Sequence, residues 1–270
     1  MKQIILDDAA LVPAAGHTSK GDQPKWQIGS QWYKADHMGY EALVECLVSS
    51  LLKKTNLQDF VTYEPIQIMY RGRTLRGCVS KNFRGKDEML VPLERLHRAY
   101  HGSGLAEAIA ALPETANRIR YTVEFVESVT GLTGFGPYLS VILELDCLFL
   151  NEDRHTNNLA VVRNEKTGVY RFCPIFDNGL ALLSDLNDYP LDNDVYHSIG
   201  RVQAKPFSMD FDEQVESANV LYGSHLRCSF TRSDVTSILE SFSDFYPPEI
   251  LSRVERVLFE QIRRYSIYFI

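Results

Sequence analysis

The chain has 270 residues, of which 45% are hydrophobic and 23% charged, and its formal net charge is -7. This length suits one large domain or two lobes that share a cleft. No stretch approaches the roughly 20 apolar residues of a membrane span, and the acidic balance argues against broad binding to a nucleic-acid backbone. Local binding of phosphate groups by a basic patch around Lys81, Arg84 and Lys86 stays an open alternative. A globular enzyme is therefore the expected class.

Export signals and disulfides are not expected. Asp7 and Asp8 interrupt the apolar start before the core of a signal peptide could form. The cysteines include no CxxC pair, so neither a zinc knuckle nor a disulfide framework is indicated. Together these features predict a cytoplasmic protein.

The first third of the chain has the pattern of a small sheet with one helix. Residues 1–6 and the segment 26–36 read as strands, and 63–83 reads as two more strands joined by a turn. Between them, 40–54 repeats leucine at every fourth position, which is typical of a helix packed on a sheet. We therefore predict a mainly antiparallel unit that ends near residue 83.

The remainder is expected to be rich in helices. Apolar spacing predicts successive helices up to the very apolar segment 137–150, and then a strand hairpin over 159–176. In the tail, Ser233 is the expected N-cap of one helix, and Pro247 and Pro248 lead into the last. The fold class is predicted to be α+β.

Two polar motifs flank that hairpin. Asp153-Arg-His-Thr-Asn-Asn158 directly precedes it, and Phe176-Asp177-Asn178-Gly179 begins where it ends. Phosphoryl transfer needs a carboxylate that orients the attacking hydroxyl, and oxygen ligands that hold Mg²⁺ against nucleotide phosphates. Asp153, Asn158 and Asp177 supply these groups. An Asp- and Asn-rich segment can also serve only to cap and turn the chain. The order of the two motifs favours the catalytic interpretation.

The two motifs resemble the catalytic loop and the metal-binding motif of protein-kinase-like enzymes, particularly HipA-like and phosphoinositide-kinase-like members. The resemblance implies a two-lobed fold, with a small antiparallel-sheet N-lobe over 1–83 and a helical C-lobe over 84–270. It also implies ATP and Mg²⁺ as cofactors, Asp153 as catalytic base, and Asn158 and Asp177 as metal ligands. Because FDNG stands where many kinases have DFG, the Phe-dependent switch of those enzymes is not carried over.

Lys34 lies in a strand-like segment, where a kinase-type lysine would meet the α- and β-phosphates and a helix glutamate. Glu41 and Glu45 are both candidate partners, because their spacing of four places them on one helical face. The resemblance to HipA-like kinases favours Glu41.

The segment 16–21 is a glycine-containing loop ahead of Lys34, where a phosphate-covering loop belongs. It matches neither GxGxxG nor a Walker motif, but Gly16, Ser19 and Gly21 are candidate nucleotide contacts. The resemblance makes Ser19 or Thr18 a candidate for autophosphorylation.

The same resemblance places an adenine-reading hinge near residues 80–82, whereas 180–210 receives no role. The predicted function is transfer of the ATP γ-phosphate to a hydroxyl of a protein Ser/Thr or of the chain itself. Two alternatives stay open: a phosphotransferase acting on an aminoglycoside or lipid headgroup, and a nucleotide-binding pseudokinase or interaction module.

Overall fold

The computed structural model describes residues 2–12 and 23–270 of the chain. Contacts divide the chain into two compact units. Unit 1 consists of Met1–Phe83, Phe176–Arg201 and Cys228–Ile270, and unit 2 of Arg84–Ile175 and Val202–Arg227. Both units draw on separate parts of the sequence, so their segments are held together by tertiary packing.

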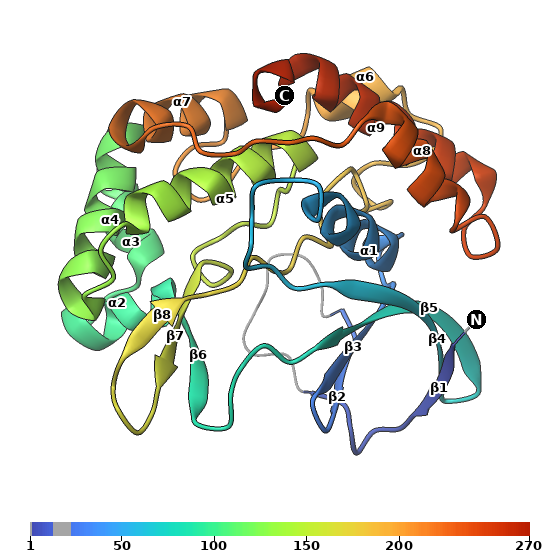
Figure 1. The fold of residues 1–270 in the computed structure, drawn as a ribbon, viewed down its shortest axis with the longest axis horizontal. Helices are drawn as coiled ribbons and strands as arrows, with labels where there is room; N and C mark the ends of the chain where they lie inside the picture. Colours follow the sequence, from blue (N-terminus) through green and yellow to red (C-terminus); the bar gives the residue numbers. More distant parts are fainter. Residues whose placement is uncertain (1, 13–22) are drawn as a thin grey trace. The chain divides into compact units, whose positions relative to one another are not determined.

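Unit 1 contains a 5-stranded sheet in the order β1-β4-β5-β3-β2 (Figure 1). Its strands are β1 (Gln3–Leu6), β2 (Lys25–Ile28), β3 (Gln31–Ala35), β4 (Tyr63–Tyr70) and β5 (Arg73–Lys81). The sheet is mainly antiparallel, as predicted, and the exception is the parallel pair β1–β4. That pair can be parallel because the long segment between its strands contains a crossover helix.

The crossover helix is α1 (Glu41–Leu52), which packs on β3, β4 and β5 and on the later helix α8. The predicted leucine repeat is confirmed, because Leu43, Leu47 and Leu51 are all fully buried. With the sheet on one side and α8 on another, nearly every side chain of α1 is buried, including two glutamates. Buried charges in such a helix need partners, and these lie in the same unit.

Unit 1 also contains the helices α6 (Val195–Ile199), α8 (Arg232–Glu240) and α9 (Pro248–Arg264) and the short 3₁₀ helix η1 (Ser266–Tyr268). The N-cap of α8 is Thr231, so the prediction of Ser233 is wrong. The Thr231 hydroxyl accepts from the N–H of Asp234, whose carboxylate accepts from the N–H of Thr231 at 2.8 Å. This capping box sets the helix start because it needs an acidic side chain three residues after the cap.

Unit 2 combines a 3-stranded antiparallel sheet in the order β6-β7-β8 with a set of helices. The strands are β6 (Glu88–Pro92), β7 (Ala160–Asn164) and β8 (Tyr170–Phe172), and the helices are α2 (Leu93–His101), α3 (Leu105–Ala110), α4 (Thr115–Thr130), α5 (Phe135–Phe149) and α7 (Phe211–Tyr222). α5 is the central element, since it is apolar on most sides and packs against α4 and α7. The predicted hairpin after α5 is confirmed as β7–β8.

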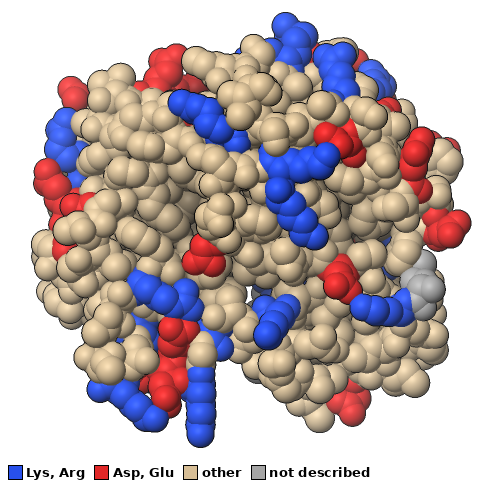
Figure 2. Space-filling view, viewed as in Figure 1, with Lys and Arg blue, Asp and Glu red and all other residues tan. Residues whose placement is uncertain are grey.

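Basic and acidic side chains lie next to one another at the lower left of Figure 2, where Figure 1 has the three-stranded sheet. Lys166 pairs with Asp87 at 2.9 Å, and Arg171 pairs with Glu88 at 2.7 Å. Basic groups on this sheet are thus balanced by neighbouring carboxylates. None of the helices in the described part of the chain is long and apolar enough to cross a membrane.

The predicted fold class is confirmed as α+β, with an N-terminal sheet and its helix followed by a largely helical part. The compact units group the chain differently from the predicted lobes, because Phe176–Arg201 and Cys228–Ile270 pack with the first 83 residues. The lobes 1–83 and 84–270 remain a prediction about domains.

Candidate functional site

Lys34 is the centre of a buried charge cluster in unit 1. Its side chain extends from β3, and Nζ donates to Glu45 on α1 and, at 2.7 Å, to Oδ1 of Asp177. The second oxygen of Glu45 accepts from the N–H of Asn178 at 3.0 Å. The cluster therefore ties together three segments of unit 1: the sheet, the helix α1 and the FDNG segment.

The charges of this cluster support one another. Burial lowers the pKa of Lys34, but the carboxylates of Asp177 and Glu45 outweigh it, so that pKa is raised well above its usual value. Burial raises the pKa of Glu45, an effect that the ammonium of Lys34 opposes. Lys34 is consequently an ammonium at neutral pH, held where a phosphate could replace one of its carboxylate partners.

The partner of Lys34 is Glu45, so the preference for Glu41 is wrong in this respect. Glu41 is the first residue of α1, and its carboxylate accepts from the N–H groups of Met38 at 2.7 Å and Gly39 at 3.0 Å. A carboxylate at a helix start turns back to these groups and also meets the positive end of the helix dipole. Glu45, one turn later, faces β3 instead. A contact of Glu41 with nucleotide stays a prediction.

Asp177 also faces a second lysine that the sequence analysis did not single out. Nζ of Lys25 on β2 lies 3.6 Å from Oδ2 of Asp177. Lys25 stands directly opposite Lys34 in the β2–β3 hairpin. The predicted pairing of short strands in this segment could have found it, because a two-residue turn at Gly29 and Ser30 fixes that register. Two cations and one carboxylate thus meet at the same point.

In unit 2, the loop 153–158 brings Asp153 and Asn158 together. The side-chain NH₂ group of Asn158 donates to the backbone oxygen of Asp153 at 2.8 Å and to its carboxylate at 3.2 Å. The carboxylate also lies 3.8 Å from Nε2 of His155 and 3.9 Å from Nζ of Lys205. Because the NH₂ end of Asn158 is used inside the loop, the amide oxygen is the end suited to a cation.

An ion pair that the sequence analysis missed lies behind this loop. Nε of Arg154 donates to Oδ2 of Asp146 on α5 at 2.9 Å, and Nη2 donates to Oδ1 at 3.0 Å. Asn151 donates to the same carboxylate at 2.9 Å. Burial raises the pKa of Asp146, and the Arg154 guanidinium opposes this shift. The sequence feature that could have indicated this ion pair is Asp146 itself, the one Asp of the very apolar segment 137–150, since a buried carboxylate needs a buried partner.

The predicted loop contacts Gly16, Ser19 and Gly21, with Thr18, lie outside the described residues. At the predicted hinge, the N–H of Asn82 donates to the backbone oxygen of Ser30 at 2.7 Å. This bond joins the end of β5 to the β2–β3 turn within unit 1.

The donor set fits Mg²⁺ bound together with nucleotide phosphates. Asp177 offers a carboxylate and Asn158 an amide oxygen, which are hard donors of the kind Mg²⁺ takes. Across residues 2–12 and 23–270, no group of three or more His, Cys, Asp or Glu side chains could hold a metal by itself. One or two protein oxygens plus phosphates are the usual arrangement for this ion. Because the two residues belong to different compact units, their joint binding stays a prediction.

No protein-family model matches the chain, and no curated protein does so either. Among solved structures, the chain is similar to the crystal structure of a Helicobacter pylori proinflammatory kinase, CtkA. The match has a TM-score of 0.61 and 14% sequence identity, and it covers 89% of this chain and 90% of that one. At this identity the likeness shows the fold, which is that of a kinase.

Proposed function

We propose that this chain is a Mg-ATP-dependent phosphotransferase of the HipA-like and phosphoinositide-kinase-like kind. It transfers the γ-phosphate to a hydroxyl of a protein Ser/Thr or of the chain itself. The observation that carries the proposal is the cluster of the buried Lys34 and Glu45 with the partly exposed Asp177, in a chain with the fold of a kinase. A lysine held by a helix glutamate is the arrangement by which kinases fix their phosphate-binding ammonium.

In this proposal the unit 1 cluster binds the nucleotide phosphates. Lys34 gives up its contact with Asp177 to phosphate oxygens and keeps Glu45, which holds the ammonium in place. Lys25, 3.6 Å from the same carboxylate, adds a second cation for the phosphates. Asp177 and Asn158 would hold Mg²⁺, which neutralises charge on the transferring phosphoryl group when bound.

Asp153 orients the acceptor hydroxyl and accepts its proton. The two bonds from Asn158 fix the backbone and the carboxylate of Asp153, and the buried Arg154–Asp146 pair anchors the loop to α5. A carboxylate held in this way reduces the reorganisation needed when charge develops during transfer. A cytoplasmic location belongs to the same proposal and is supported by the five cysteines, all within the described residues, none of which forms a disulfide.

The direct test is incubation of the purified protein with Mg²⁺ and ATP labelled at the γ-phosphate, followed by mass spectrometry of the protein. We expect label on a serine or threonine of the chain or of an added seryl peptide. Asp177→Asn should abolish the label, whereas the exposed-site variant Glu165→Gln should keep it. Label found only on added aminoglycosides or lipids would identify a small-molecule phosphotransferase. Mg-ATP binding with no transfer to any acceptor would identify a pseudokinase.

A further inference from the structure

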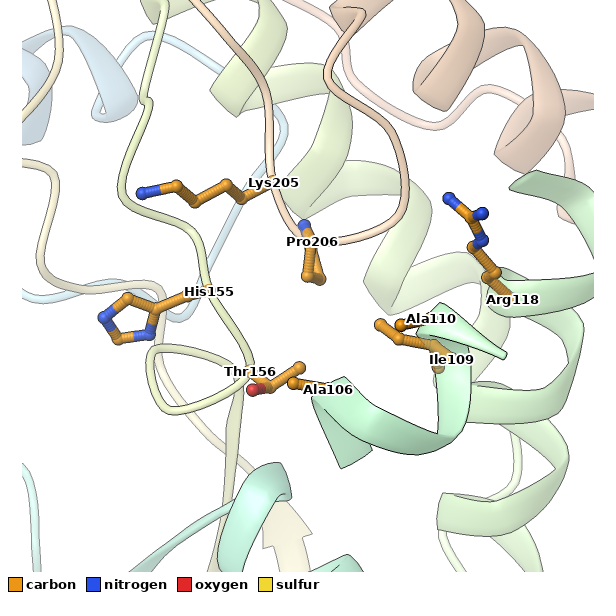
Figure 3. A pocket seen from close by; sticks show the side chains of 8 residues that line it. All are labelled: Ala106, Ile109, Ala110, Arg118, His155, Thr156, Lys205 and Pro206. Carbon is orange, nitrogen blue, oxygen red and sulfur yellow. The ribbon is translucent and has the colours of Figure 1, made fainter. Parts of the chain in front are cut away.

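A pocket in unit 2 opens beside the loop that carries Asp153. Its volume is about 340 Å³, at the lower end of the range for small-ligand sites. The lining residues are Ala106, Ile109, Ala110, Arg118, His155, Thr156, Lys205 and Pro206. Figure 3 shows Lys205 and His155 on one side and Arg118 on the other, with Pro206 and the small apolar side chains of α3 between them. Apolar walls and cationic ends suit a short ligand that carries a negative charge.

Lys205 is the residue that connects this pocket to the reaction. Its Nζ lies 3.9 Å from Oδ1 of Asp153, and its side chain is 35% exposed. A group bound to Lys205 would therefore lie within a few ångströms of a hydroxyl oriented by Asp153. The lysine comes from the segment 200–210, far in sequence from the catalytic loop.

The segment around Lys205 is fixed by bonds to α4 and α7. Arg118 on α4 donates to the backbone oxygen of Phe207 at 2.8 Å, and the side chain of Gln214 on α7 accepts from the N–H of Phe207 at 3.0 Å. The N–H of Ala204 donates to the oxygen of Met209 at 2.9 Å, which closes the segment on itself. A lysine on such a clamped segment is preorganised, so little conformational entropy is lost when it binds a ligand.

We propose that this pocket binds the phosphate acceptor and that Lys205 selects a hydroxyl compound with an anionic group next to the hydroxyl. The inference rests on the proposed function and names its substrate class. In the transfer, a bond forms between the acceptor oxygen and the γ-phosphorus, and the bond from that phosphorus to the β-phosphate oxygen breaks. Asp153 takes the hydroxyl proton, and ADP leaves. The anionic group pairs with Lys205, and the adjoining carbon chain lies on Ile109 and Pro206.

Two sources share this chemistry, namely an acidic segment of a protein and a small anionic alcohol. Three probes separate them: a seryl peptide with glutamates on both sides of the serine, the same peptide with glutamines, and glycerol 2-phosphate. For the wild-type chain we expect the KM of the acidic peptide to be about tenfold below that of the glutamine peptide, the usual worth of one charged contact. Phosphorylation of glycerol 2-phosphate with neither peptide used would assign the pocket to a small anionic alcohol.

Lys205→Ala should remove the preference for the acidic acceptor and leave the KM for ATP within about twofold. Lys205→Glu should reverse the preference, towards a seryl peptide flanked by lysines, which loss of structure alone would not do. Lys166→Ala, which changes an exposed lysine paired with Asp87 outside the pocket, should change neither. A rise of the KM for ATP in Lys205→Ala, with acceptor preference intact, would assign Lys205 to the nucleotide and overturn the proposal.

Binding provides a readout that does not need catalysis. Calorimetry with the acidic peptide and glycerol 2-phosphate should show binding to the wild-type chain and about tenfold weaker binding to Lys205→Ala. If no phosphoryl transfer occurs but this difference is present, the proposed function fails and the anionic site stands. Equal affinity of the two proteins for both probes would overturn the site, whatever the enzymatic activity.

Discussion

The two clusters of candidate site residues differ in how their charges are supported. In unit 1, Lys34, Glu45 and Asp177 hold one another, so the groups proposed to meet ATP are also the ones that neutralise buried charge. In unit 2, the residue proposed to act in catalysis and the residues that neutralise buried charge are different ones. The ion pair of Arg154 with Asp146 fixes the loop to α5, while the side chain of Asn158 donates a hydrogen bond to the carboxylate of Asp153. Function and stability should therefore be coupled in the first cluster and separable in the second.

The largest effect is expected for Asp153→Asn. Loss of the carboxylate that we propose accepts the hydroxyl proton should lower kcat by about 10³-fold. The asparagine has almost the same shape and keeps acceptor capacity, so the free energy of unfolding should change by less than about 1 kcal/mol. Steady-state kinetics and urea unfolding measure the two quantities. A matched loss of stability and activity would contradict the separation argued for unit 2.

The support of the same loop is probed by Arg154→Met. This change leaves the carboxylate of Asp146 buried without its guanidinium, which should lower the free energy of unfolding by about 3 kcal/mol. The double variant Asp146→Asn with Arg154→Met should recover much of that loss, because it removes the buried charge. Urea unfolding of the three proteins checks this. No recovery in the double variant would show that the pair acts by packing and not by charge.

In unit 1, Glu45→Gln should change both properties. Lys34 keeps Asp177 but loses the group that holds it during ATP binding, so kcat/KM for ATP should fall about 30-fold and stability by about 1 kcal/mol. Glu41→Gln is the matched variant on the same helix. Glu41 bonds the loop before α1 and makes no bond to Lys34, so its change should lower stability by a similar amount and lower kcat/KM less than Glu45→Gln does. Equal kinetic losses would show that Glu41 matters for ATP as much as the glutamate that holds Lys34.

The last effect concerns another carboxyl of unit 1, that of Asp36. Burial raises its pKa to about 7, although its carboxylate accepts from the N–H of Ala42. Since the folded pKa exceeds the unfolded one, the folded state binds the extra proton, and stability falls as the pH rises towards 7. Between pH 5 and 7 we expect a loss of about 1 kcal/mol per pH unit that Asp36→Asn lacks. Urea unfolding of both proteins across this range measures the difference, and parallel curves would refute it.

The sequence predicted those groupings that depend on local spacing. Asp153 and Asn158 meet inside one short loop, and Lys34 lies on a strand whose pairing with the short strand before it was indicated by the residue pattern. The choice between Glu41 and Glu45 could not be made in this way, because residues four apart share a helical face and only packing decides which turn meets β3.

Other features depend on contacts between distant segments. The Arg154–Asp146 pair joins the loop that carries Asp153 to a buried helix, and Lys205 lies near Asp153 on a segment that bonds to Arg118 and Gln214. Neither motif spacing nor periodicity contains that information. The N-cap of α8 was mistaken for a different, local reason: both Thr231 and Ser233 have suitable hydroxyls, and the carboxylate of Asp234, three residues after Thr231, selects Thr231.

The most direct test of the central claim is a double-mutant cycle on phosphoryl transfer with Asp153→Asn, Asp177→Asn and the combined variant. Residues that act on the same transferring phosphoryl group give losses far from additive. We predict that each single variant loses about 10³-fold in kcat/KM and that the double variant is hardly worse than either. Losses that multiply in the double variant, or near-wild-type transfer in either single variant, would contradict the account.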